Sequence, residues 1–95
     1  MTREQKTVLA AKTRVLKALA HHARLWMVEQ LHGGERCVCM LVEGLGLDFS
    51  TVSKHQLVLK NAGLVASRRD GNWLHYRLAC PCVLDFTDCI AGLKK

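Results

Sequence analysis

The stretch CVCMLVEGLGLDFSTVSKHQLVLKNAGLV, residues 37–65, decides the fold expected for this chain. Its first part predicts a short helix over residues 37–45, followed by a tight glycine-containing turn. Asp48 can cap a second helix over residues 49–62, and Gly63 can end that helix in a left-handed conformation. Two short helices joined at such a turn form a helix-turn-helix pattern.

The next stretch, LVASRRDGNWLHYRL over residues 64–78, predicts a β-hairpin. Asp70-Gly71 is a strong hairpin signal between two strand-like runs. In the second run Leu74, Tyr76 and Leu78 would share one face, because side chains alternate along a strand. A basic hairpin directly after a helix-turn-helix is typical of a DNA-binding wing. An ordinary solvent-exposed hairpin is the alternative.

Helices are also expected on the N-terminal side of this unit. The first covers about residues 2–20, where Thr2 and Gln5 can form a capping box. The second covers about residues 22–32 and would be stopped by Gly33-Gly34.

A final helix is expected to begin at Pro81, which suits the first helical position. Its apolar residues Val83, Phe86, Ile90 and Leu93 follow a heptad-like spacing. Such a stripe on a terminal helix favours pairing with a symmetry mate, and the first helix offers a second stripe. The expected fold class is mainly α with a small β-hairpin. We expect a single winged helix-turn-helix domain over residues 1–95, forming a homodimer through its N- and C-terminal helices.

Composition restricts the class of partner. Fourteen Lys and Arg against eight Asp and Glu give a formal net charge of +6, and a symmetric dimer would carry 2 × 6 = +12. This favours nucleic acid as a partner, with a merely basic protein as the alternative. No apolar run approaches the ~20 residues of a membrane span, and the charged N-terminus predicts no export. We therefore expect a cytoplasmic protein without a membrane partner. No paired carboxylates, phosphate loop or Ser-His arrangement supports an enzyme.

The DNA contacts follow from the helix-turn-helix pattern. The N-terminal half of a recognition helix enters the major groove, and a wing reaches backbone or minor groove. The residues expected at base edges and phosphates are Ser50, Thr51, Ser53, Lys54 and His55 on the helix, and Arg68, Arg69, Asn72 and Arg77 on the wing. For His55, packing within the protein or a contact to phosphate is favoured over a role as metal ligand.

Five cysteines, an odd number without an export signal, favour reduced thiols over a disulfide framework. Four of them form two C-x-C pairs, Cys37 with Cys39 and Cys80 with Cys82, and the fifth is Cys89. Small buried side chains are the alternative interpretation. Thiolates suit arsenite, antimonite, zinc, cadmium and lead. All five are therefore candidate metal ligands.

Helix geometry limits how the thiols can combine. Residues two apart on a regular helix point about 200° apart. Cys37 and Cys39 could thus share one ion only at a frayed helix start, or if binding unwinds the first turn. Arg36 and the helix N-terminus are expected to favour their thiolate forms. Cys82 and Cys89 would lie ~10 Å apart along one helix.

A third ligand must therefore come from elsewhere. The preferred site joins Cys37 and Cys39 with Cys80 or Cys82, within one subunit or across the dimer. A separate site of terminal cysteines is an alternative. If all four thiols meet, they would form a tetrahedral site for zinc, cadmium or lead.

These features together resemble the ArsR/SmtB family of metal-sensing winged-helix repressors, over about residues 16–78. LKALAHHARLWMVEQL, ERCVCMLVEGLGL, STVSKHQLVLKNAGLV and RRDGNWLHYRL resemble its second-helix segment, thiol-sensor motif, recognition helix and wing, in that order. The chain departs from the family pattern at a few positions: His21-His22 replaces Asp-Pro, Gln56 replaces an inward Leu, Asp48 and Phe49 stand where Gln and Ser are common, and Val42 stands where some arsenic sensors carry a third Cys.

The resemblance implies a metal-free homodimer that binds a palindromic double-stranded DNA operator and leaves it when thiolates bind an inducer. The arsenic-responsive members are the most similar, so As(III) or Sb(III) is the expected inducer. Two alternatives keep the fold: sensing of Cd, Pb or Zn through four thiolates, and sensing of oxidants or persulfide through a disulfide. A small cytosolic thiol metal carrier without DNA binding is the alternative from another class.

Overall fold

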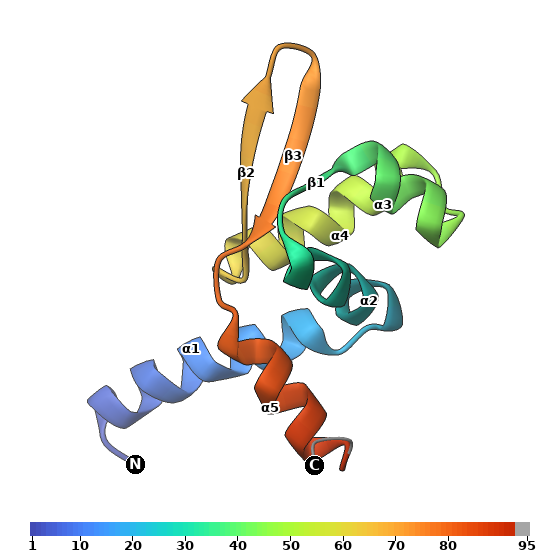
Figure 1. Ribbon diagram of the computed structural model, residues 1–95. Coiled ribbons are helices and arrows are strands. Elements are labelled where there is room, and N and C mark those ends of the chain that lie inside the picture. Colours follow the sequence, from blue (N-terminus) through green and yellow to red (C-terminus); the bar gives the residue numbers. More distant parts are fainter. Residues whose placement is uncertain (93–95) are drawn as a thin grey trace.

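The computed structural model describes residues 1–92 as helices around a core, with a projecting β-hairpin (Figure 1). The elements, in chain order, are α1 (Arg3–Leu19), α2 (His22–Gln30), the 3-10 helix η1 (Leu31–Gly33), β1 (Arg36–Cys37), α3 (Val38–Leu45), α4 (Phe49–Asn61), β2 (Val65–Asp70), β3 (Trp73–Leu78) and α5 (Cys82–Ile90). This arrangement is the expected mainly α fold with a hairpin, and each of the expected helices and strands is present.

The first two helices begin with side-chain caps. Thr2 and Gln5 form the expected capping box at the start of α1, each side chain bonding the other residue's backbone N–H. The ring of His21 caps α2, because its Nδ1 accepts from the backbone N–H of Ala23 at 3.0 Å. The histidine thus satisfies a free helix-start amide at the position where the expected pattern has Asp.

The second helix is shorter than expected. It ends at Gln30, and the chain tightens into η1 before Gly34 takes a φ of 131°. That φ lies in the region that glycine reaches at little cost. The sequence expectation of one helix over residues 22–32 therefore merges an α-helix with a 3-10 turn.

The helix-turn-helix is formed by α3 and α4. Gly46 ends α3 in the left-handed conformation with a φ of 67°, and Asp48 caps α4 by accepting from the backbone N–H of Thr51. Gly44 lies under Trp26 of α2, and a Cβ at Gly44 would stand 2.4 Å from the end of that ring. A glycine here lets α2 and α3 pack closely.

The core lies where α2, α3 and α4 meet the base of the hairpin. Its largest fully buried apolar side chains are Met27, Leu31, Leu41, Leu59 and Leu64. Leu64 follows the end of α4, and its backbone N–H donates to the carbonyl of Leu59 on that helix. Gln56 is also buried, and neither of its amide atoms has a hydrogen-bond partner within the described chain.

The hairpin is the wing, and it carries a third strand. Asp70 pairs with Trp73 across the Gly71-Asn72 turn, and Gly71 has a φ of 61°. On its other edge β3 pairs antiparallel with β1, with Cys37 opposite His75. The sequence expectation of a two-stranded hairpin was incomplete, because a two-residue strand has no periodicity to read.

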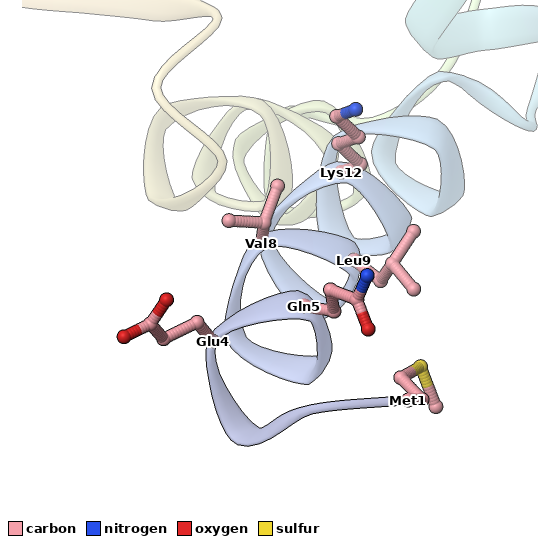
Figure 2. A pocket seen from close by; sticks show the side chains of 6 residues that line it. All are labelled: Met1, Glu4, Gln5, Val8, Leu9 and Lys12. Atoms are coloured by element: carbon pink, nitrogen blue, oxygen red, sulfur yellow. The ribbon is translucent and has the colours of Figure 1, made fainter.

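The terminal helices α1 and α5 lie at the end of the molecule opposite the wing tip (Figure 1). Helix α5 begins at Cys82, one residue later than expected, with Pro81 as its N-cap residue. Both helices expose large apolar side chains: Val8, Leu9, Leu16, Phe86 and Ile90. Figure 2 shows Val8 and Leu9 on the N-terminal half of α1, with Leu9 on the side of the helix nearer to Met1. Leu93, part of the expected stripe, lies outside the described residues.

Within residues 1–92, no helix combines the length and the apolar character that a bilayer crossing requires.

Candidate DNA interface and thiol pairs

The start of α4 carries the predicted groove-reading residues. Ser50 and Lys54 are exposed, and Thr51 and Ser53 are half-buried. The Thr51 hydroxyl donates to the carboxylate of Asp48, the residue that caps the helix. Thr51 therefore belongs first to the helix cap, whereas Ser50 and Lys54 present exposed polar side chains at this end of α4.

His55 points back into the protein. Its Nδ1 lies 3.1 Å from Nη1 of Arg24, and its ring centre lies 4.4 Å from that of His21. Burial, together with the nearby His21 and Arg24, lowers the pKa of His55 below its ordinary value. A neutral ring that accepts from Arg24 fits this position, in line with the expected packing role. A contact of His55 with DNA stays a prediction.

The four predicted wing residues do not share one environment. Arg68 donates from Nε and Nη2 to the carboxylate of Glu35, at 2.6 to 2.9 Å. This contact lowers the pKa of Glu35 below its ordinary range. Arg69, Asn72 and Arg77 are exposed, and no hydrogen bond or ion pair of Arg69 is found among residues 1–92. Arg69 is thus free for phosphate, while Arg68 is bound to Glu35.

Glu35 is a functional candidate that the sequence analysis missed. It directly precedes β1, whose pairing with β3 brings it to Arg68 on the wing. Its carboxylate also lies 3.9 Å from Nδ1 of His75. No local pattern could have revealed it, since the contact joins residues 33 positions apart in the chain.

The first thiol pair lies at the junction between β1 and α3. Cys37 is the N-cap residue of α3, with extended backbone at φ −69° and ψ 144°, and Cys39 lies in the first helical turn. The thiol of Cys39 donates to that of Cys37, and the two Sγ atoms are 2.7 Å apart. Because Cys37 precedes the helix, the 200° separation of a regular helix does not apply. The pair lies at the helix start, which is the first of the two arrangements in which both thiols could share one ion.

This pair is linked to both halves of the DNA-binding unit. On one side it opens α3, the helix that packs on α4. On the other side Cys37 is a strand residue paired with His75 of the wing. The pair therefore lies where α3 and the wing meet.

The expected thiolate stabilisation is wrong for Cys39. Its hydrogen bond to Cys37 raises the pKa of Cys39, with burial and the charge of Cys37 acting in the same direction. The backbone N–H groups of Cys39 and Met40 act the other way but are outweighed. Arg36 is not among the groups that shift the pKa of Cys39, and its guanidinium donates to the Glu35 carbonyl.

The second thiol pair lies between β3 and α5. The Sγ atoms of Cys80 and Cys82 are 3.4 Å apart, and this contact raises the pKa of Cys80, assisted by burial. The backbone amides of the helix start do not overcome it. Cys89 is exposed farther along α5.

The two thiol pairs remain separate within one chain. Cys37 lies opposite His75 on β3. The strand continues from His75 for three more residues, ~10 Å, to Leu78, and Cys80 comes after the end of the strand. Among residues 1–92, no three His, Cys, Asp or Glu side chains form a group that could hold a metal ion. The predicted union of Cys37 and Cys39 with Cys80 or Cys82 thus stays a prediction, as does a four-thiolate site.

A groove opens beside the first pair, between α3 and the wing. Its volume is about 440 Å³. Cys37 and Cys39 lie at its wall, and the remaining lining is largely apolar, including Val42, Phe49, Trp73 and Leu74. Arg69 and Asn72 border it on the wing side. The thiols therefore face a space that can take an organic group.

Comparison with known proteins identifies the family of this chain. The family model described as "Bacterial regulatory protein, arsR family" matches residues 21–67. The chain is 37% identical over 93 residues to the uncharacterized HTH-type transcriptional regulator Rv0081 of Mycobacterium tuberculosis, covering 97% of this chain and 79% of that protein. The chain belongs to the ArsR/SmtB family. As a member of this family of transcriptional regulators, it is not an enzyme.

Two further relatives of this ArsR/SmtB-family chain are a repressor and a DNA-binding domain. The arsenical resistance operon repressor of Escherichia coli K12 is 39% identical over 66 residues, covering 68% of this chain and 56% of that protein. A solved structure, the homodimeric winged helix-turn-helix DNA-binding domain of a possible ArsR-family regulator from Mycobacterium bovis, matches with a TM-score of 0.87. It is 30% identical and covers 97% of this chain and 88% of that chain. The winged helix-turn-helix fold expected from the sequence is thereby confirmed.

Proposed function

We propose that this regulator is a repressor whose metal-free homodimer binds a palindromic operator and releases it when a thiol-binding metal or metalloid is captured. Arsenite or antimonite is the proposed inducer. The observation that carries the proposal is the Cys37–Cys39 pair, with its Sγ atoms 2.7 Å apart at the joint of α3 and the wing. The 39% identity to an arsenical resistance repressor supports this choice of inducer.

The dimer is proposed to form through α1 and α5. Their exposed apolar side chains gather at one end of the molecule, around a hollow of about 360 Å³ that includes Leu16, Phe86 and Ile90. Burying this surface against a second copy would remove it from water. The similar domain from Mycobacterium bovis is homodimeric, which supports the same assembly here.

Operator binding would combine α4 with the wing. Lys54 and Arg69 are exposed cations, and the net charge of +6 per chain attracts the DNA backbone. Ser50 and Ser53 would meet base edges, where hydroxyls discriminate weakly.

Capture of the inducer would act through the helix start. Two thiolates on one arsenic or antimony atom fix the positions of Cys37 and Cys39, and the strain falls on β1 and the first turn of α3. These two elements support α4 and the wing. A dimer with occupied sites would therefore no longer fit both half-sites of the operator at once. A change from 1:99 to 99:1 in operator occupancy needs a coupling of ~5.5 kcal/mol.

The experiment is a release assay. Reduced, metal-free protein is bound to its operator, and arsenite, antimonite, cadmium, lead and zinc are titrated against DNA fluorescence anisotropy. We expect release by arsenite and antimonite at the lowest concentrations. If cadmium, lead or zinc acts first, the four-thiolate alternative is favoured. Release by none of these ions would refute the proposal.

Oxidant or persulfide sensing is the second candidate, because each thiol pair lies within 3.4 Å. Mass spectrometry after treatment with peroxide or polysulfide would reveal a bridged pair, together with operator release in the absence of any metal. The metal-carrier alternative is dropped, since the chain belongs to a family of transcriptional regulators.

A further inference from the structure

We infer that the Cys37–Cys39 site is selective for trivalent arsenicals that carry one organic substituent, and that the groove beside the pair receives this substituent. The inference rests on the proposed function: it keeps trivalent arsenic as the atom that the thiols capture, and it specifies that this atom carries an organic substituent in place of the third oxygen of arsenite. Two features on the same surface point to it: a pair of thiols without a third ligand, and an adjoining apolar groove.

The number of thiols at the site determines how many As–O bonds of an arsenical can be replaced by As–S bonds. Arsenite has three exchangeable As–O bonds, and thiolates are the soft ligands that replace them. Only two thiols meet here, and no third Cys, His, Asp or Glu joins them within residues 1–92. Val42, which lines the groove, has an inert side chain. Arsenite bound at this pair would keep one As–O bond.

An arsenical with one organic substituent needs only two thiols to replace all of its As–O bonds. In phenylarsonous acid, the hydrate of phenylarsine oxide, one arsenic bond is already to carbon and the other two are to hydroxyl groups. Both As–O bonds break and two As–S bonds form, to Cys37 and Cys39. The two thiol protons leave with the two hydroxyl groups as two water molecules. Arsenic stays trivalent, so no oxidant or reductant is needed.

The groove has the lining that an organic substituent requires. Val42, Phe49, Trp73 and Leu74 contribute to a volume of about 440 Å³, which is larger than a phenyl ring. Trp73 is 60% exposed and Phe49 is 56% exposed, so a bound ring would cover apolar surface that now faces water. Aromatic contacts of this kind add binding energy beyond simple burial.

The test uses two proteins, the unaltered full chain and a variant with Cys80, Cys82 and Cys89 replaced by serine. Phenylarsonous acid, methylarsonous acid and arsenite are titrated against each. Native mass spectrometry with a competing dithiol gives binding, and fluorescence anisotropy gives operator release. In both proteins we expect one arsenical per Cys37–Cys39 pair. Phenylarsonous acid should act at a concentration about tenfold lower than arsenite, or lower still. A tenfold difference corresponds to a preference of about 1.4 kcal/mol in binding free energy.

A third thiol should reverse the preference. Val42→Cys places a thiol three residues after Cys39, on the same helix face. We expect it to improve arsenite binding by about tenfold or more, with no such gain for phenylarsonous acid. Met40→Cys is the matched control, because Met40 is exposed next to Cys39 and is not part of the groove lining. It should leave the order of the arsenicals unchanged.

Trp73 tests the groove itself. Trp73→Ala should lower the preference for phenyl over methyl about three- to tenfold, the value of one aromatic contact. Binding of methylarsonous acid should stay the same, and Trp73→Phe should restore most of the preference.

Two results would overturn the inference. One is arsenite matching phenylarsonous acid in the full chain and weakening when Cys80 and Cys82 are removed, which would indicate a three-thiol site with a second pair. The other is a phenyl preference unaffected by Trp73→Ala. Both results leave the proposed function intact, because arsenite or an organic arsenical still acts through Cys37 and Cys39. Failure of every arsenical and metal to bind the pair would overturn the proposed function as well.

Discussion

Gln56 is the residue whose environment conflicts most with its chemistry. It is 1% exposed and its amide has no hydrogen-bond partner within the described chain. A buried polar group without a partner costs about 1 to 3 kcal/mol. The sequence analysis noted that Gln56 stands where the family pattern has Leu. Sequence alone does not show whether the buried amide finds a hydrogen-bond partner.

Gln56→Leu is therefore expected to stabilise the protein by about 1 to 3 kcal/mol, because Leu is similar in size and leaves no polar group unpaired. Chemical denaturation at one fixed protein concentration measures the free energy of unfolding. Gln56→Ala is the comparison, since it removes the amide but leaves a cavity. A Leu variant less stable than the parent would indicate that the amide has a water or other partner.

His55 predicts a dependence of stability on pH. Its pKa is lowered in the folded protein by burial, His21 and Arg24, so the unfolded chain takes up a proton first as the pH falls. Its contribution to stability is complete above the ordinary value of 6.5 and is lost as the pH falls from there through the folded pKa.

His55→Gln should flatten the fall in melting temperature between about pH 7.5 and 5.5, because Gln can still accept from Arg24 but does not titrate in this range. The control is the exposed His22→Gln substitution, which leaves His55 and Arg24 in place. Equal slopes for His55→Gln and the parent would show that His55 does not govern this range.

At the scale of elements, the wing is more closely tied to the helices than a hairpin pattern suggests. Helix starts, the Asp48 cap and the hairpin turn could be predicted because each depends on residues close together in sequence. Strand β1 and the Glu35–Arg68 ion pair could not, because they depend on a register between distant segments. The same holds for Trp26 over Gly44.

The two neighbouring wing arginines should differ in DNA binding. Arg69 is exposed without a protein partner among the described residues, whereas Arg68 is bound to Glu35. Arg69→Ala should weaken operator binding and reduce the slope of log K against log salt by about one. Arg68→Ala should change the slope less. Equal losses would show that Arg68 leaves Glu35 to bind phosphate.

At the scale of the whole molecule, the exposed apolar side chains of α1 and α5 form the proposed dimer surface. Ile90 is 69% exposed and Phe86 is 45% exposed. The heptad-like spacing predicted this surface, although Leu93 lies outside the described residues. Spacing along the sequence does not show which distant thiols meet, and this is why the third ligand could not be predicted.

Ile90→Lys should weaken dimerisation about tenfold or more, about 1.4 kcal/mol, because it puts a charge into the proposed apolar interface. Sedimentation equilibrium without DNA measures the effect. Leu57→Lys is the control, since Leu57 is similarly exposed but lies on α4, and it should leave association unchanged. An Ile90→Lys dimer as stable as the parent would place the interface elsewhere.

The central claim is that inducer capture at the start of α3 releases the operator. The most direct measurement compares two double variants, Cys37→Ser/Cys39→Ser and Cys80→Ser/Cys82→Ser, by operator anisotropy with and without an arsenical. We predict that both bind operator when metal-free, and that only the Cys37→Ser/Cys39→Ser protein stays bound when phenylarsonous acid is added. Normal release from the Cys37→Ser/Cys39→Ser protein would contradict the account.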